Sequence, residues 1–377
     1  MGIQMRSRSP AKSLLFGGVS LILFCLVFET ASRIPRFVMY VRGGQVGAWA
    51  PETFRVYDIG PTGPRSFFRT QYKVERLGFR GKAPPLPGKD VADPGTLDVF
   101  CIGDSVTFGH GSSSDETTYP AYLEAWLKNR GRACRVYNAG TPSYISSQVF
   151  LKLHHLVANY RPDVVIIHAG WNDITAAADA DYPLTWMGAA DQFGPPRMPY
   201  SSPLKTALAC SALFQIIQSE IAKFPIRIDQ ETFLQRRLEA MDQPVARTPV
   251  RDAPRDMFRR NIEGMIDLVV GMGAQPILIP LTTYFDPRSE LTQEEKRRFR
   301  SALLADLDIL SWKEHIHEYN QVLRNVARDK GVPVVETAEA MKPSVYYLDL
   351  RHLTDEGNAV FAGLVGEVVL SSVSDER

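Results

Sequence analysis

From residue 96 onward the chain alternates short apolar runs with longer segments of helical periodicity, and this pattern constrains the fold most. Strands that alternate with helices build parallel β-α-β units. Apolar residues recur three or four positions apart within residues 119–127, 150–157, 258–269, 316–326 and 361–368. The predicted buried strands are residues 97–102, 135–138, 164–168, 276–279 and 333–336. The pattern therefore predicts an α/β protein, a three-layer α/β/α sandwich with a five-stranded parallel sheet.

Two long segments interrupt this alternation. Residues 174–255 lie between the third strand and its return helix, and residues 284–312 follow the fourth strand. Loops of this length in a compact domain commonly carry function. We interpret both as insertions into one domain spanning residues 96–372. Residues 43–95 are rich in glycine and proline. They predict a membrane-proximal stalk and small accessory segment, with a hairpin near residues 70–77.

The N-terminal region contains an uncharged apolar stretch, residues 13–28, after a basic tail of residues 1–12. As a helix it spans roughly 24 Å, less than a hydrocarbon core of about 30 Å. It needs tilt, or extension to residue 31, to cross a membrane. We predict a transmembrane anchor at residues 13–31. A cleaved signal peptide and a buried core helix stay open as alternatives.

The charges on either side of the apolar stretch give little information about its orientation in a membrane. Three arginines between residues 33 and 42 balance the three basic residues before the apolar stretch. The positive-inside rule therefore gives little preference. The short tail favours a single-pass protein whose body lies outside the cytoplasm.

Charge and composition exclude several classes of protein. The chain has 43 basic and 42 acidic residues, so it lacks the basic excess of a nucleic-acid-binding protein. Four cysteines, one of them in the apolar stretch, are too few for a disulfide scaffold. Neither a P-loop nor a Gly-x-Ser-x-Gly elbow occurs. His315 and His317 point to different sides of a predicted helix, and we expect no metal and no cofactor.

Residues whose side chains or backbone N–H groups could take part in catalysis follow the predicted strands. Ligands of open α/β sheets bind beyond the carboxyl ends of the strands. Each residue has an ordinary interpretation as a turn, a helix cap or a surface ion pair. Together they predict a serine nucleophile with an imidazole base that a carboxylate orients. In chain order they are Ser105, Gly140, Asn172, Asp349 and His352.

With these residues the chain resembles the SGNH hydrolases, also called the GDSL family. The resemblance covers roughly residues 96–372 apart from the insertions, and it implies the family's flavodoxin-like fold. Residues 77–81 are similar to a stretch of membrane-anchored bacterial members. Four blocks match: Ser105 in Gly-Asp-Ser, Gly140, Asn172 in Gly-x-Asn-Asp, and Asp349-x-x-His352.

The resemblance also implies roles for these residues. Ser105 is the expected nucleophile, His352 the general base and then acid, and Asp349 the residue that orients it. The expected oxyanion hole consists of the Ser105 and Gly140 N–H groups and the Asn172 side-chain amide.

Five neighbouring residues receive expectations of their own. Trp171 is expected to line the acyl pocket, and His110 to contact substrate. His168 is interpreted as a hydrogen-bonded strand-end residue. Asp104 and Asp173 are expected to hold their loops.

The predicted function is a serine esterase that forms an acyl-enzyme, acting on a carbohydrate O-acetyl group or a similar small acyl ester. An O-acetyltransferase acting on an envelope polysaccharide shares the same triad. A non-enzymatic glycan-binding module is the third hypothesis. The expected partners are an acyl ester or acylated glycan and the membrane, with no nucleic acid. The acyl group, the acceptor, protein partners and the oligomeric state are not encoded in any motif.

Overall fold

The computed structural model describes Val27, the strands between residues 49 and 74, and residues 75–85, 95–177, 249–285 and 309–373. All of these except Val27 belong to one compact unit, Ala48–Pro195 together with Ile228–Arg377. The predicted N-terminal anchor, apart from Val27, and most of both insertions lie outside the described residues. Within the described part of the chain, no helix has the length and apolar character that a membrane crossing requires.

A parallel sheet forms the centre of this unit. Its four strands run in the order β6-β5-β7-β8. All five residues of β7 are buried, as expected for a parallel strand covered on both faces. The strands are β5 (Leu97–Gly103), β6 (Cys134–Asn138), β7 (Val164–His168) and β8 (Gln275–Leu278).

The predicted fifth strand, residues 333–336, is not a full strand. Its pairing is a single parallel bridge between Leu278 and Val334. Leu278 N donates to Pro333 O at 3.0 Å, and Val335 N donates to Leu278 O at 2.9 Å. Pro333 has no N–H to extend the ladder. The prediction of five strands is therefore corrected to four, with one further bridge at the β8 edge.

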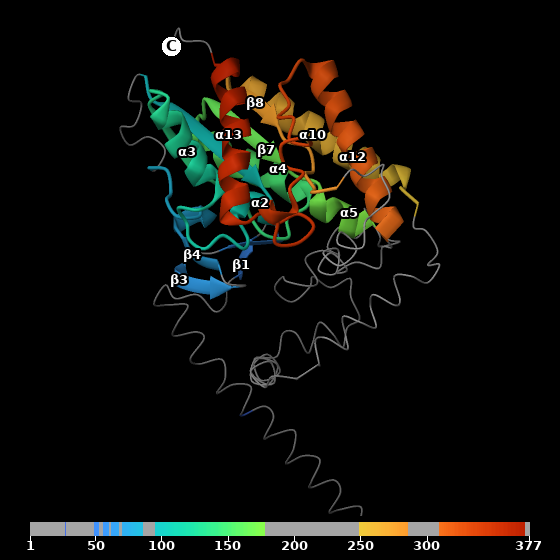
Figure 1. Cartoon of the computed structure of the whole chain (residues 1–377), viewed down its shortest axis with the longest axis horizontal. Coiled ribbons are helices and arrows are strands. Elements are labelled where there is room, and N and C mark those ends of the chain that lie inside the picture. The colour runs from blue at the N-terminus through green and yellow to red at the C-terminus, as the bar shows by residue number, and fades with distance from the viewer. Residues whose placement is uncertain are drawn as a thin grey trace, which may run out of the picture. The chain divides into compact units, whose positions relative to one another are not determined.

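Helices cover both faces of the sheet, giving the three predicted layers (Figure 1). Helices α3 and α13 pack together on one face, and α4, α10 and α12 lie on the other. Ring contacts join each group, Tyr119 to Phe361 at 5.1 Å and Phe258 to Tyr319 at 4.9 Å between centroids. The helices are α3 (Tyr119–Asn129), α4 (Ser146–His155), α10 (Asp252–Gly271), α12 (Ile309–Lys330) and α13 (Asp355–Ser372).

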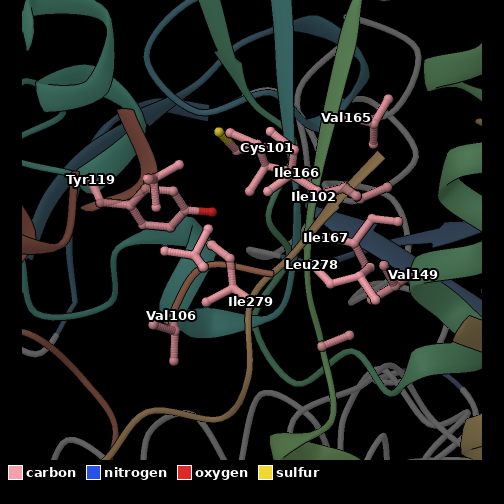
Figure 2. Packing of buried hydrophobic residues seen from close by; sticks show 14 of the residues in the cluster. Cys101, Ile102, Val106, Tyr119, Val149, Val165, Ile166, Ile167, Leu278 and Ile279 are labelled. Carbon is pink, nitrogen blue, oxygen red and sulfur yellow. The ribbon is translucent and has the colours of Figure 1, made fainter. Parts of the chain in front are cut away.

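The core fills the space between sheet and helices. Figure 2 shows Tyr119 and Val149 on opposite sides of the strands, with Ile166 and Ile167 of β7 between them. All four side chains are fully buried. Because both faces of the sheet are covered, the carboxyl ends of the strands are the free edge where a ligand can bind.

The segment before β5 is built from short antiparallel pairs and then joins the core. β1 (Trp49–Glu52) pairs with β2 (Val56–Ile59), and β3 (Thr62–Phe67) pairs with β4 (Thr70–Val74). A hairpin is present as β3–β4, but it spans residues 62–74, so only β4 falls within the predicted range of residues 70–77. It starts earlier than expected, and a 3-10 turn, η1 (Arg76–Gly78), follows it. Phe79 is fully buried against Phe100, and Arg80 N donates to Asn138 O at 3.0 Å. Residues 79–80 thus belong to the folded core.

Candidate active site

Ser105 lies where β5 turns into the one-turn helix α2 (Ser105–Phe108). Asp104 caps this helix, and its carboxylate accepts a hydrogen bond from Val106 N at 2.9 Å. Gly140 packs directly against the turn, because a Cβ at this position would lie 2.2 Å from Phe108 N. The sequence thus folds into a tight turn that holds the Ser105 hydroxyl above the sheet edge.

Three side chains form a hydrogen-bonded row at this edge. Ser105 Oγ lies 2.8 Å from His352 Nε2, although 247 positions separate the two residues. His352 Nδ1 lies 2.6 Å from Asp349 Oδ2. With the Nδ1 proton directed at the carboxylate, Nε2 presents a lone pair to the hydroxyl. The arrangement can therefore remove the hydroxyl proton and return it to a leaving group.

Asp349 is held in place by its own loop. Its Oδ1 accepts hydrogen bonds from Arg351 N at 2.9 Å and from His352 N at 2.8 Å. Burial by itself raises the pKa of Asp349, but the His352 ring, the Arg351 charge and the hydrogen bonds lower it below its usual range. Asp349 is thus an anion at all ordinary pH values, as an orienting carboxylate requires.

The predicted oxyanion donors surround the same turn. Ser105 N begins α2, where backbone N–H groups have no intrahelical acceptor. Asn172, in α5 (Trp171–Ala177), donates one Nδ2 hydrogen to Tyr144 O at 2.9 Å, and an amide has a second. Gly140 N donates to Asn138 Oδ1 at 3.0 Å. Donation from Gly140 to an oxyanion requires this bond to break, so its role stays a prediction.

Two buried aspartates hold the surrounding loops. Asp173 accepts hydrogen bonds from Ser146 N at 2.8 Å and Ser146 Oγ at 2.5 Å, which joins α5 to the start of α4. Burial raises the pKa of Asp173 to about 6. Burial also raises the pKa of Asp104, whose Oδ2 has no hydrogen-bond partner in the described part of the chain.

The two candidate substrate-contacting residues, His110 and Trp171, have different surroundings. The His110 ring lies 4.6 Å from the His352 ring, and His110 N donates to Ser105 O at 2.9 Å. Burial, with the nearby His352, lowers the pKa of His110 to about 3, so the ring is neutral. Trp171 is fully buried, with Trp312 at 6.4 Å between ring centroids. Contact of either residue with a substrate stays a prediction.

His168 differs from expectation. The sequence interpretation made it a hydrogen-bonded strand-end residue, but both of its ring nitrogens are buried without a partner among the described residues. Burial lowers the pKa of His168 to about 3. Its neutral ring packs against Phe361 at 5.7 Å. His168 therefore behaves as an aromatic core residue.

The sequence interpretation missed Arg80, which anchors the loop that follows Ser105. We name residues 105–118 the serine loop. Arg80 is 3% exposed. Its Nη1 donates to Phe108 O at 2.8 Å and Gly109 O at 2.7 Å. Nη2 donates to Ser114 O at 3.0 Å, and Nε pairs with Asp115 Oδ1 at 2.7 Å. The only sequence signal was the family-like stretch at residues 77–81.

Lys152 is a second buried cation that was missed. Its Nζ donates to Thr141 Oγ1 at 2.8 Å, beside Gly140, and to Gly78 O at 3.2 Å. Lys152 lies three positions after the buried Val149 on α4, and this spacing was the available signal. Together with Arg80, it ties residues 78–80 to the two loops that flank Ser105.

The serine loop also contacts the region around His352. We name residues 345–355 the histidine loop. Ser113 N donates to Asp355 Oδ1 at 2.9 Å, and Asn358 Nδ2 donates to Ser112 Oγ at 3.2 Å. These bonds hold the two loops side by side. Among the described residues, no group of three or more His, Cys, Asp or Glu side chains is arranged to hold a metal ion.

Comparisons with known proteins complete the description. The family model described as GDSL-like Lipase/Acylhydrolase matches residues 101–360. A lipase/acylhydrolase from Enterococcus faecalis is 15% identical, covers 74% of this chain and 99% of its own, and gives a TM-score of 0.43. The acetyl xylan esterase AlAXEase is 16% identical over 74% of this chain and 100% of its own, with a TM-score of 0.42. A variant of Axe2, an acetyl xylan esterase from Geobacillus stearothermophilus, is 15% identical over 74% and 97%, with a TM-score of 0.42. Among curated proteins, none matches the chain.

Proposed function

We propose that this chain removes a small acyl group, such as acetyl, from a carbohydrate. The premise is that the chain belongs to the GDSL-like lipase/acylhydrolase family and is an SGNH-type hydrolase of ester bonds. The observation that carries the proposal is the continuous row from Ser105 through His352 to Asp349, with contacts of 2.8 Å and 2.6 Å. A proton can move along this row from the hydroxyl to the imidazole without any rearrangement.

The first half of the reaction forms an acyl-enzyme. His352 Nε2 takes the proton from Ser105 Oγ while Oγ attacks the ester carbonyl carbon. The Asp349 carboxylate stabilises the imidazolium that results. His352 then gives the proton to the departing sugar oxygen as the ester bond breaks, and the acyl group stays on Ser105.

The second half regenerates the enzyme. Water attacks the acyl carbonyl carbon while His352 accepts its proton, and His352 then returns that proton to Ser105 Oγ as the bond between Oγ and the acyl carbon breaks and the carboxylic acid leaves. In both halves the carbonyl oxygen becomes an oxyanion. Ser105 N, Gly140 N and Asn172 Nδ2 are the proposed donors to it, and losing one such donor typically costs about 3–4 kcal/mol of transition-state stabilisation.

Two features support the choice of substrate. Ser105 is only 7% exposed, which favours a short acyl chain over a long one. The predicted location of the body outside the cytoplasm favours an acylated glycan. A sugar hydroxyl that replaces water in the second half would make the protein an O-acetyltransferase. Product on an added glycan, rather than free acetate, identifies that alternative.

Labelling with a fluorophosphonate probe tests the nucleophile. We expect the full chain to be labelled and to release acetate from acetylated xylo-oligosaccharides, and Ser105→Ala to lose both properties. Ser371→Ala, at the exposed end of α13, is the matched control and should retain both. Normal labelling of Ser105→Ala would refute the assignment.

We also propose that residues 13–31 anchor the protein in a membrane with the catalytic domain outside the cytoplasm. The supporting observation is the uncharged apolar stretch at residues 13–28. Membrane fractionation of the full chain, with protease added to intact cells, tests both parts. Recovery in the soluble fraction contradicts the anchor, and full protection from protease contradicts the orientation.

A further inference from the structure

Arg351 is a cation next to the triad whose charge no carboxylate neutralises directly. Its backbone N–H donates to Asp349 Oδ1 at 2.9 Å, and it immediately precedes His352. Its half-buried guanidinium lies over the Trp171 ring, with Cζ 5.9 Å from the centroid. Within the residues that the structure describes, this guanidinium has neither an ion pair nor a hydrogen bond.

Most other half-buried or buried arginines of this unit donate to a carboxylate or a carbonyl, whereas Arg132, in the turn before β6, has no such side-chain contact among the described residues. Arg80 donates to three carbonyls and pairs with Asp115 at 2.7 Å. Arg135 forms a two-pronged contact with Asp98 at 2.6 Å and 2.7 Å. Arg255 pairs with Glu318 at 3.3 Å. A guanidinium offers five N–H donors in a planar fork that matches a carboxylate. Arg351 is therefore the arginine next to the triad whose fork has no partner among the described residues.

Neither aspartate near Arg351 bonds to it: Asp349 bonds to His352, and Asp104 caps α2 through Oδ1 while its Oδ2 has no partner among the described residues. The charge of Arg351 helps to lower the pKa of Asp349, but that carboxylate is bound to His352. It acts in the same direction on Asp104, which caps α2. Neither aspartate forms an ion pair with the guanidinium. Charge compensation for these two residues is the alternative explanation, and the experiment below separates it from ligand binding.

We propose that Arg351 binds a carboxylate carried by the ester substrate, so that the preferred substrate is anionic. The carboxylate could belong to the acyl group, as in a succinyl ester, or to the sugar, as in an acetylated uronic acid. In either case it forms a charge-assisted, two-pronged contact with the guanidinium, which stays stacked on Trp171. This inference rests on the proposed function, because it assigns a substrate class to the same site.

Two matched pairs of esters test the proposal on the purified full chain. The acyl-side pair is 4-nitrophenyl hydrogen succinate and its methyl ester. The sugar-side pair is acetylated galacturonic acid and its methyl ester. We expect kcat/KM for one anionic ester to exceed that of its neutral partner by about tenfold or more at low ionic strength, and added salt to reduce this ratio.

The variants assign this preference to one residue. Arg351→Gln should bring the ratio close to one and leave kcat/KM for neutral esters within about threefold. Arg351→Lys should retain part of the ratio, because it keeps the charge but loses the fork. Arg260→Gln, which removes an exposed arginine of α10, is the matched control and should change neither ester of a pair.

Two results would overturn the inference. Equal rates within both pairs for the unmodified chain would show that no substrate carboxylate is recognised. An equal loss on neutral and anionic esters in Arg351→Gln would show that the charge only balances Asp104 and Asp349. In both cases the proposed function stands if Ser105→Ala is inactive on neutral esters, so the two failures are distinguishable.

Discussion

The serine loop and the histidine loop meet at Ser105 and His352 and again at Ser113 and Asp355, but they are held in different ways. The histidine loop is held mainly by itself. Asp349 accepts hydrogen bonds from the two residues that follow Leu350, and Leu348 N donates to His352 O at 2.8 Å. The serine loop depends on distant segments. Arg80 anchors its carbonyls, and Asn138 Nδ2 donates to Phe108 O at 3.2 Å.

The difference shows which part of the candidate active site depends on residues far away in the chain. A loop held by contacts three or four positions apart keeps its geometry wherever its motif occurs. A loop held by a remote arginine needs a second segment of chain in place. Arg80 precedes residues 101–360, which the family model matches. The serine loop therefore depends on a residue outside the matched region.

The largest effect is expected from a variant that removes the Asp349 charge, which pairs with His352 inside the histidine loop. Asp349→Asn keeps an oxygen for the two backbone donors but removes the charge that faces His352 Nδ1. The imidazole then favours the wrong tautomer, and kcat should fall by about 10³–10⁴. Hydrolysis of 4-nitrophenyl acetate measures this, with Asp267→Asn on the surface of α10 as control. A loss of less than about tenfold would exclude Asp349 from the triad.

The second prediction tests the serine loop's dependence on Arg80. Arg80→Met leaves Asp115 and three carbonyls without their donor. Because the arginine is buried, the free energy of unfolding should fall by about 3–5 kcal/mol. The fluorophosphonate labelling rate should fall more than tenfold under conditions where the fold is intact.

The matched control for Arg80 is Arg135→Met. Arg135 pairs with Asp98 at the opposite end of the sheet, and both side chains are partly exposed. Removing it should cost about 1 kcal/mol or less. Urea denaturation of both variants makes the comparison. Equal losses would mean that burial of Arg80 contributes nothing special to the serine loop.

The third prediction is that acid changes stability in opposite directions through Asp349 and through Asp104 and Asp173, because their pKa shifts have opposite directions. Asp349 has a lowered folded pKa, so its contribution to stability is present above the unfolded value of about 3.9 and is lost as pH falls below it. Asp104 has a raised folded pKa, so its contribution declines as pH rises above about 3.9. Asp173, with a pKa of about 6, acts like Asp104 between about pH 4 and 6.

Urea denaturation between pH 3 and 8 measures these contributions. Asp173→Asn should reduce the decline in stability between about pH 4 and 6, and Asp104→Asn should reduce the decline that begins above about pH 4. Asp349→Asn should instead reduce the loss of stability in acid. Identical pH profiles for Asp104→Asn and Asp349→Asn would contradict the opposite environments of the two carboxylates.

The smallest expected effect concerns the contacts between the loops. Asp355→Asn weakens the bonds to Ser113 at the surface, and its cost should stay below about 1 kcal/mol. Because each loop has other anchors, kcat/KM on a neutral ester should change less than about threefold. A large loss of kcat with unchanged stability would show that this contact aligns Ser105 with His352.

Much of the fold followed from apolar periodicity. The five predicted helices and four of the five predicted strands are present, since burial on one helix face or along a whole strand leaves a periodic signal. Residues 333–336 were overestimated because the apolar run is real, but Pro333 limits its pairing. His168 was misjudged because a histidine's hydrogen bonds depend on its neighbours in space.

By itself, the sequence determined the layered α/β architecture, the position of Ser105 at the end of a strand, and the spacing of Asp349 and His352 within one loop. These depend on periodicity and on spacing within one loop, which are local properties. Only the tertiary structure decided that Ser105 Oγ lies 2.8 Å from His352 Nε2 and that Arg80 anchors the serine loop. It also left the Arg351 guanidinium without a carboxylate partner among the described residues. Such pairings join residues far apart along the chain, and their energy depends on burial that no local pattern records.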